Sequence, residues 1–127
     1  MIERLAPALR QFADARTNLS ANVLATVRES INDRRRETAA TLDAAGVEIA
    51  DDVVCADDGR IISIRIYRGG PSLAPAVVYC HSGAFVLGNL DMDHLQCVEL
   101  ARRAQCTVVS VDYRLAPEHP HPAGFDD

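Results

Sequence analysis

Apolar residues recur at helical spacing through the first third of the chain. A first stripe lies within residues 2–12, with charged residues between its apolar positions, and predicts an amphipathic helix of about three turns. A second stripe follows Ser20, a residue type that caps helices. Its members are Val23, Leu24, Val27 and Ile31. Residues 28–45 are rich in Ala, Arg and Glu and extend the helical prediction to Gly46, a residue type that often ends helices. Both stripes need an apolar surface to pack against.

The pattern after Gly46 is typical of β-strands. Residues 47–54 and 61–67 are rich in β-branched side chains and flank an Asp-Asp-Gly turn, which predicts a β-hairpin. In the second run, isoleucines alternate with Ser63, Arg65 and Tyr67. This alternation predicts a buried isoleucine face and an exposed opposite face.

Two continuous apolar runs follow, at residues 76–80 and 107–111. Continuous rather than alternating apolar residues predict parallel strands that are covered on both faces. Residues 91–104, between them, carry acids in the first turn and arginines in the last, which suits a helix dipole at both ends. A strand, helix, strand unit of this kind predicts a right-handed parallel connection, so the fold class is α/β.

Composition limits the classes of protein to which the chain can belong. The 127 residues, 48% hydrophobic and 24% charged, are typical of a single soluble globular domain. A net charge of -5 argues against a nucleic-acid partner, which requires a basic surface. The only basic run, residues 34–36, is interpreted as a solvated helix face.

Neither a membrane segment nor a metal site is expected. Charged residues interrupt the N-terminus, and no apolar run reaches the ~18 residues of a membrane span, so we predict a cytoplasmic protein. The four cysteines show no C-x-x-C spacing, which argues against a metal site or a disulfide framework. The histidines have no zinc-type spacing from a carboxylate. They are His81, His94, His119 and His121.

The candidate chemistry lies in the turn His81-Ser82-Gly83-Ala84-Phe85, where the strand at residues 76–80 ends. A turn of small residues between a strand and a helix aims backbone N–H groups at a ligand. We therefore expect an anion-binding loop.

Asp112, after the next strand, offers a carboxylate near that loop. It could act in catalysis, but its position beside Tyr113 and Arg114 favours loop anchoring through an ion pair.

Two motifs together resemble a known family. Residues 81–85 resemble the His-Gly-Gly-Gly-Phe loop of the hormone-sensitive-lipase-like branch of the α/β-hydrolases. Residues 112–122 resemble the Asp-Tyr-Arg-Leu-Ala-Pro-Glu-x-x-x-Pro segment of the same esterases. The resemblance implies that residues 46–127 form the N-terminal half of an α/β-hydrolase domain, with about four strands in a mixed or parallel sheet. Residues 1–45 are then a helical cap-like segment.

The resemblance also implies an activity and a site. These enzymes hydrolyse carboxylic esters with a Ser, Asp, His triad and no cofactor, so the expected substrate is a small acyl ester. Carried over by position, Gly83 and Ala84 are the oxyanion-hole donors, while His81 and Ser82 shape the loop. Ser82 and Ala84 replace family glycines, and a Cβ costs about 1–2 kcal/mol wherever φ must be positive.

One departure from the family pattern is large. The 127 residues contain no Gly-x-Ser-x-Gly turn, and Ser82 has Cys80 and Ala84 where the glycines would stand. We therefore expect the nucleophile, acid and base of the triad to be absent, and little or no esterase turnover from this chain alone.

Two interpretations remain open. The chain represents a carboxylic ester hydrolase by its N-terminal portion, or it is a catalytically inactive fragment or interaction module, completed by a second chain. In the family fold the strand at residues 76–80 is central, and an apolar central strand left at a sheet edge pairs with another chain. That strand favours a homo-oligomer or a complementing C-terminal half.

Overall fold

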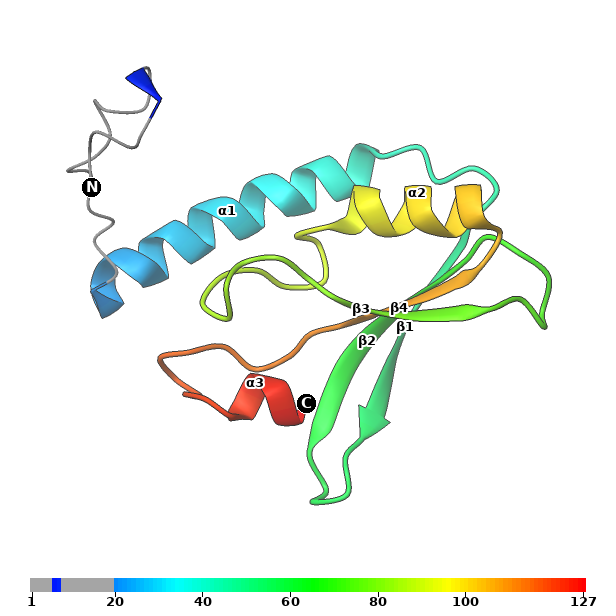
Figure 1. The fold of residues 1–127 in the computed structure, drawn as a ribbon. Coiled ribbons are helices and arrows are strands. Elements are labelled where there is room, and N and C mark those ends of the chain that lie inside the picture. Colours follow the sequence, from blue (N-terminus) through cyan, green and yellow to red (C-terminus); the bar gives the residue numbers. More distant parts are fainter. Residues whose placement is uncertain (1–5, 8–19) are drawn as a thin grey trace.

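The computed structural model describes residues 6–7 and 20–127. Its elements are α1 (Ala21–Thr41), β1 (Glu48–Cys55), β2 (Ile61–Arg68), β3 (Ala76–Cys80), α2 (His94–Ala104), β4 (Thr107–Val111) and α3 (Ala123–Asp126). The strands form one sheet in the order β1-β2-β4-β3 (Figure 1). β3 and β4 are parallel and joined through α2, whereas the other pairs are antiparallel. The predicted α/β class and mixed four-stranded sheet are confirmed.

The helical first third agrees with the prediction only in part. The helix expected at residues 2–12 falls outside the described residues. α1 begins after Ser20, as predicted, and the Ser20 carbonyl accepts a hydrogen bond from the Leu24 N–H at 2.9 Å. Leu24 is buried and Ile31 half-buried, but Val23 and Val27 are 37% and 38% exposed, so half of the predicted stripe is exposed.

The end of α1 was predicted too late. The helix stops at Thr41, because Leu42 is extended, with φ −69° and ψ 134°. Gly46 has φ +80° and lies in the turn before β1, not at the helix end. None of the described helices has the length and apolar content that crossing a membrane requires.

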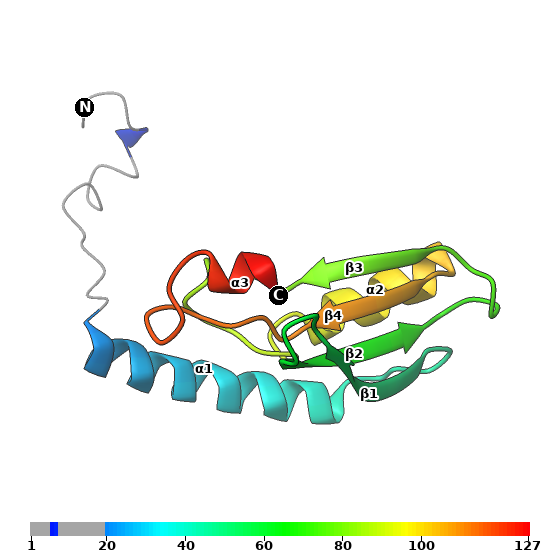
Figure 2. The same ribbon diagram turned by 90° about the horizontal axis from the view of Figure 1, so that it is seen from below.

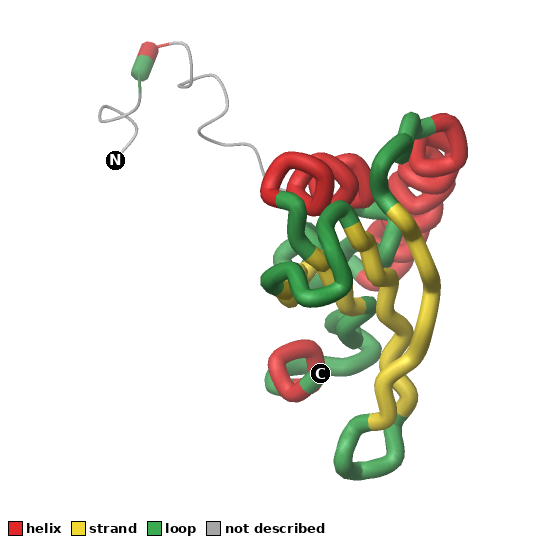
Figure 3. The backbone as a smooth tube through the Cα atoms, turned by 90° about the vertical axis from the view of Figure 1, so that its right-hand side faces the viewer, coloured by secondary structure: helices red, strands yellow, loops and turns green. Residues whose placement is uncertain are grey.

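The hairpin formed by β1 and β2 is confirmed, with Gly59 at φ +85° in its turn. It projects from the rest of the molecule (Figure 3). Ile62 and Ile64 are buried as predicted. Tyr67 was expected on the exposed face but is fully buried, because α2 covers that face of β2.

The core lies between α2 and the sheet. α1 and α2 lie on one side of the sheet and α3 on the other (Figure 1), and α2 packs on β2 and β4. The buried residues that form the core cluster are Tyr67, Cys97, Val98, Ala101, Cys106 and Val108. Burial raises the pKa of the Cys97 thiol to about 11, so this thiol is an inert core group.

β3 is an edge strand of the described sheet, with β4 as its one strand neighbour among the described residues (Figure 2). Val77 is 38% and Val78 71% exposed, so the prediction that this strand is covered on both faces was wrong. The apolar run is present, but the neighbour that would cover it is not among the described residues.

Candidate active site

The loop after β3 has an unusual backbone. Gly83, Ala84 and Phe85 have φ values of +131°, +53° and +61°. The Val86 and Leu87 N–H groups both donate to the Gly83 carbonyl, at 3.1 and 3.0 Å, which closes a tight turn. A Cβ on Gly83 would overlap the Leu87 carbonyl oxygen, so this position requires glycine twice over, for its φ and for its space. Ala84 adopts the left-handed conformation that its Cβ disfavours, whereas Ser82 does not.

The amide groups of this loop differ in what they bind. The Ser82 N–H donates to Oδ2 of Asp93 at 2.6 Å. Within residues 20–127, the N–H groups of Gly83, Ala84 and Phe85 have no acceptor. Three consecutive N–H donors thus lack a partner among the described residues.

His81 is buried beneath the loop, only 3% exposed. Its ring stacks on Tyr113 at a centroid distance of 4.2 Å, and the Tyr113 hydroxyl donates to the His81 carbonyl at 2.7 Å. Its Nδ1 lies 2.9 Å from the Ser82 carbonyl, which can only accept, so Nδ1 carries the proton. A Cβ on Gly88 would lie 2.5 Å from this nitrogen. The imidazole is therefore held in place by the loop, and its buried Nε2 has no hydrogen-bond partner among the described residues.

Arg28 of α1 is a site residue that sequence reasoning missed. Its guanidinium donates to the Val86 carbonyl at 2.6 Å, to the Ala116 carbonyl, and to both carboxylate oxygens of Glu118 at 2.8 Å. These hydrogen bonds hold the pKa of the Glu118 carboxyl below its usual value. No local signal could have found this residue, since its partners lie 58 to 90 positions along the chain.

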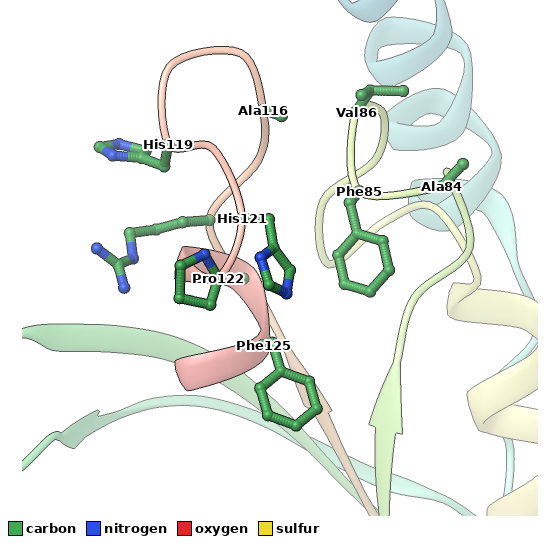
Figure 4. A pocket seen from close by; sticks show the side chains of 10 residues that line it. Ala84, Phe85, Val86, Ala116, His119, His121, Pro122 and Phe125 are labelled. Atoms are coloured by element: carbon green, nitrogen blue, oxygen red, sulfur yellow. The ribbon is translucent and has the colours of Figure 1, made fainter.

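A second hydrogen bond joins the same segments directly. The Ala116 N–H donates to the Phe85 carbonyl at 2.8 Å. Between the two segments lies a pocket of about 220 Å³ (Figure 4). One wall is formed by residues 84–86 and the other by the segment that contains Ala116, His121 and Phe125. The pocket is mainly apolar and lies against the loop that carries the free N–H groups.

Asp112 does not make the expected ion pair. Arg114 instead pairs with Asp127, from Nε to Oδ2 at 2.9 Å, and Arg60 also pairs with Asp127. Burial raises the pKa of Asp127, but hydrogen bonds from Arg114 outweigh it and the net pKa is lowered. Among the described residues, no cluster of His, Cys, Asp and Glu could hold a metal ion.

Known proteins share this architecture. A family model of the α/β hydrolase fold matches residues 77–127. Esterase LipI of Mycobacterium tuberculosis is 56% identical over 54 residues, which are 42% of this chain and 17% of LipI. Carboxylic ester hydrolase LipN of the same organism is 37% identical over 64% of this chain and 22% of LipN. The crystal structure of esterase LipW from Mycobacterium marinum superposes with a TM-score of 0.82 and 61% identity, over 99% of this chain and 40% of LipW.

Residues 77–127 match the α/β hydrolase fold, and these relatives support the hormone-sensitive-lipase-like branch of that family. The chain spans about a fifth of the length of these curated relatives and less than half of LipW. The relatives' names describe ester hydrolases. Ser82 and Ala84 stand where the His-Gly-Gly-Gly-Phe motif has glycine.

Proposed function

We propose that residues 81–88 are the oxyanion-binding side of a carboxylic ester hydrolase active site. Gly83 and Ala84 donate their N–H groups to the oxygen that becomes negative when an acyl ester is attacked, while His81 and Ser82 shape the loop. The observation that carries the proposal is the run of adjacent N–H groups at Gly83, Ala84 and Phe85 without an acceptor in residues 20–127. Gly83 and Ala84 are the two that the resemblance to the family loop selects. The ester hydrolase relatives support the reaction class.

The chemistry follows from where the charge develops. Attack on an ester carbonyl turns its oxygen into an oxyanion, and prepositioned donors stabilise that state without reorganising. Losing one such donor costs roughly 2.7–4 kcal/mol of barrier. The left-handed conformation of Ala84 costs about 1–2 kcal/mol, and the contacts made by Arg28 and Ala116 oppose relaxation of the loop.

The covalent steps need groups that these residues do not offer. The 127 residues contain no Gly-x-Ser-x-Gly turn, and the Ser82 hydroxyl is bonded to Asp93 at 3.0 Å. We therefore propose that the nucleophile, the base and the acid belong to further polypeptide. Residues 1–45 act in this proposal as a cap-like segment, since Arg28 of α1 reaches the loop.

The direct test is a chimera in which this chain replaces the matched segment of LipW. With a short-chain p-nitrophenyl ester, we expect turnover from the chimera. We expect neither turnover nor fluorophosphonate labelling from the 127-residue chain alone. A folded chimera without turnover, or labelling of the chain alone, would contradict the proposal.

A second candidate function rests on the exposed edge of the sheet. Val78 is 71% and Phe125 80% exposed, and both line a cavity of about 470 Å³ between β3 and α3. An unpaired apolar edge strand is a template for strand addition. We propose that this face docks the complementing polypeptide, and that the isolated chain uses it to form a homo-oligomer.

A further inference from the structure

Asp93 lies next to the loop and holds it. Asp93 is only 7% exposed and immediately precedes α2. Oδ2 accepts the Ser82 N–H at 2.6 Å, and Oδ1 accepts the Ser82 hydroxyl at 3.0 Å. The Tyr79 hydroxyl, from β3, donates to Oδ2 at 3.4 Å. One carboxylate thus joins the end of β3, the loop and the start of α2.

This carboxylate has no cation partner among residues 20–127. Its negative charge is compensated by three neutral donors and by the N-terminus of α2, where the Asp93 carbonyl accepts the Cys97 N–H at 3.0 Å. Hydrogen bonds to an ionised acceptor are about twice as strong as those between neutral groups. Leaving a buried charge without them strongly destabilises the folded state. The Ser82 N–H is therefore committed to Asp93.

We infer that Asp93 is a positioning residue that selects which N–H groups of the loop face the substrate. Fixing the Ser82 N–H on Asp93 sets the peptide plane that immediately precedes the unpartnered N–H groups of Gly83 and Ala84. Ser82 has a role that the family's glycine cannot have, because its hydroxyl adds a second tether to the same carboxylate. This inference rests on the proposed function.

The first experiment does not need activity. In ¹H–¹⁵N spectra of the 127-residue chain, the Ser82 amide proton should be shifted downfield and protected from exchange. Asp93→Ala should remove both properties, because no side-chain acceptor then remains for the Ser82 N–H. A Ser82 amide that exchanges freely in the unsubstituted chain would overturn the inference.

The second experiment measures kinetics in the LipW chimera. Asp93→Ala should lower kcat roughly 100-fold or more, the effect of losing a donor, while KM changes little. Ser82→Ala keeps the N–H tether and should lower kcat less. In the Asp93→Ala background, Ser82→Ala should add no further loss, since the carboxylate that the hydroxyl binds is already gone.

Asp91→Ala is the matched control. It removes a carboxylate two positions away that pairs with Arg65 at 2.7 Å and does not touch the loop, so kcat should be unchanged. An active chimera whose folded Asp93→Ala variant keeps its kcat would overturn the inference and leave the proposed function standing. If Asp93→Ala does not fold, an unchanged kcat for Ser82→Ala overturns it instead. An inactive parent chimera contradicts the proposed function, and the amide spectra still decide the role of Asp93.

Discussion

Ala84 and Phe85 have left-handed backbone conformations in a loop whose Gly83 has no room for a Cβ. Each such non-glycine residue costs about 1–2 kcal/mol. Strain of this kind persists only where neighbouring contacts impose it, and the Phe85 carbonyl is held by the Ala116 N–H. The loop is therefore fixed before any ligand arrives.

Ala84→Gly should stabilise the chain by about 1 kcal/mol, because glycine accepts the left-handed conformation without the Cβ clash. Urea unfolding measures the difference. Ala40→Gly, at an exposed position in α1, is the control and should destabilise by about 1 kcal/mol. Destabilisation by Ala84→Gly would show that the loop does not impose this conformation.

His94 makes stability depend on pH. It is buried, with Nδ1 2.9 Å from the Tyr67 hydroxyl, and burial followed by the nearby Arg65 charge lowers its pKa below the usual 6.5. As pH falls, the His94 imidazole takes up its proton at a higher pH in the unfolded chain than in the folded chain. The contribution of His94 to stability is therefore complete above pH 6.5 and is lost as pH falls toward the lowered pKa.

The free energy of unfolding in urea should therefore be smaller at about pH 5.5 than at about pH 7.5. His94→Gln, which does not titrate, should flatten that dependence. An equal slope in both proteins would rule out His94 as its source.

Sequence reasoning found the loop but not the residues that hold it. Residues 81–85 form a contiguous motif, so local sequence was enough to select them. Arg28 binds partners that are distant along the chain, and Asp93 belongs to no motif that would point to its contact with Ser82. Their roles depend on tertiary packing, and the roles of Gly83 and Ala84 as oxyanion donors stay predictions.

At the scale of elements, α1 is coupled to the active-site loop through Arg28. The Arg28 side chain is 16% exposed and binds two backbone carbonyls and a carboxylate on two separate segments. Lysine carries a single ammonium and cannot span these three acceptors with the same geometry. Arg28 thus joins α1 to Val86 and Ala116, which line opposite walls of the pocket in Figure 4.

Arg28→Ala should destabilise the chain by about 2 kcal/mol, since hydrogen bonds to charged groups contribute about 1.5–3 kcal/mol and its carbonyl partners stay partly buried. Arg28→Lys should recover less than half of this loss. Arg35→Ala, on the exposed face of the same helix, should change stability by less than about 0.5 kcal/mol. Thermal unfolding of the three variants checks the order, and equal effects at positions 28 and 35 would contradict the coupling.

Periodicity predicted the elements well but not what covers them. The hairpin and the β3, α2, β4 unit follow from local patterns and turn residues. Tyr67 was predicted to be exposed because alternation assigns side chains to the two faces of β2 but does not show that α2 covers the face that carries Tyr67. α1 was predicted too long because Ala-rich sequence favours helix on either side of the extended Leu42.

At the scale of the whole molecule, the exposed edge β3 is the feature from which we predict association. The pattern of residues 76–80 is that of a strand buried on both faces, and no local signal reveals whether a neighbour is present. Exposed valines on an unpaired edge favour contact with a second chain.

The unsubstituted chain should therefore self-associate in size-exclusion chromatography with light scattering, and Val78→Lys should shift it toward monomer. Val53→Lys, at a 57% exposed position on the projecting hairpin, is the matched control and should not change the mass. A monodisperse, cooperatively melting monomer for the unsubstituted chain would contradict association through β3.

The central claim is that the loop N–H groups stabilise an oxyanion, and kcat of Gly83→Ala in the LipW chimera tests it most directly. A Cβ there meets the Leu87 carbonyl and displaces the donors, so kcat should fall roughly 100- to 1,000-fold with little change in KM. Gly46→Ala, the control, also places a Cβ at a positive φ, +80°, but in open space away from the loop. The chimera with this substitution should therefore keep the parent kcat. A folded Gly83→Ala chimera with the parent kcat would contradict the account.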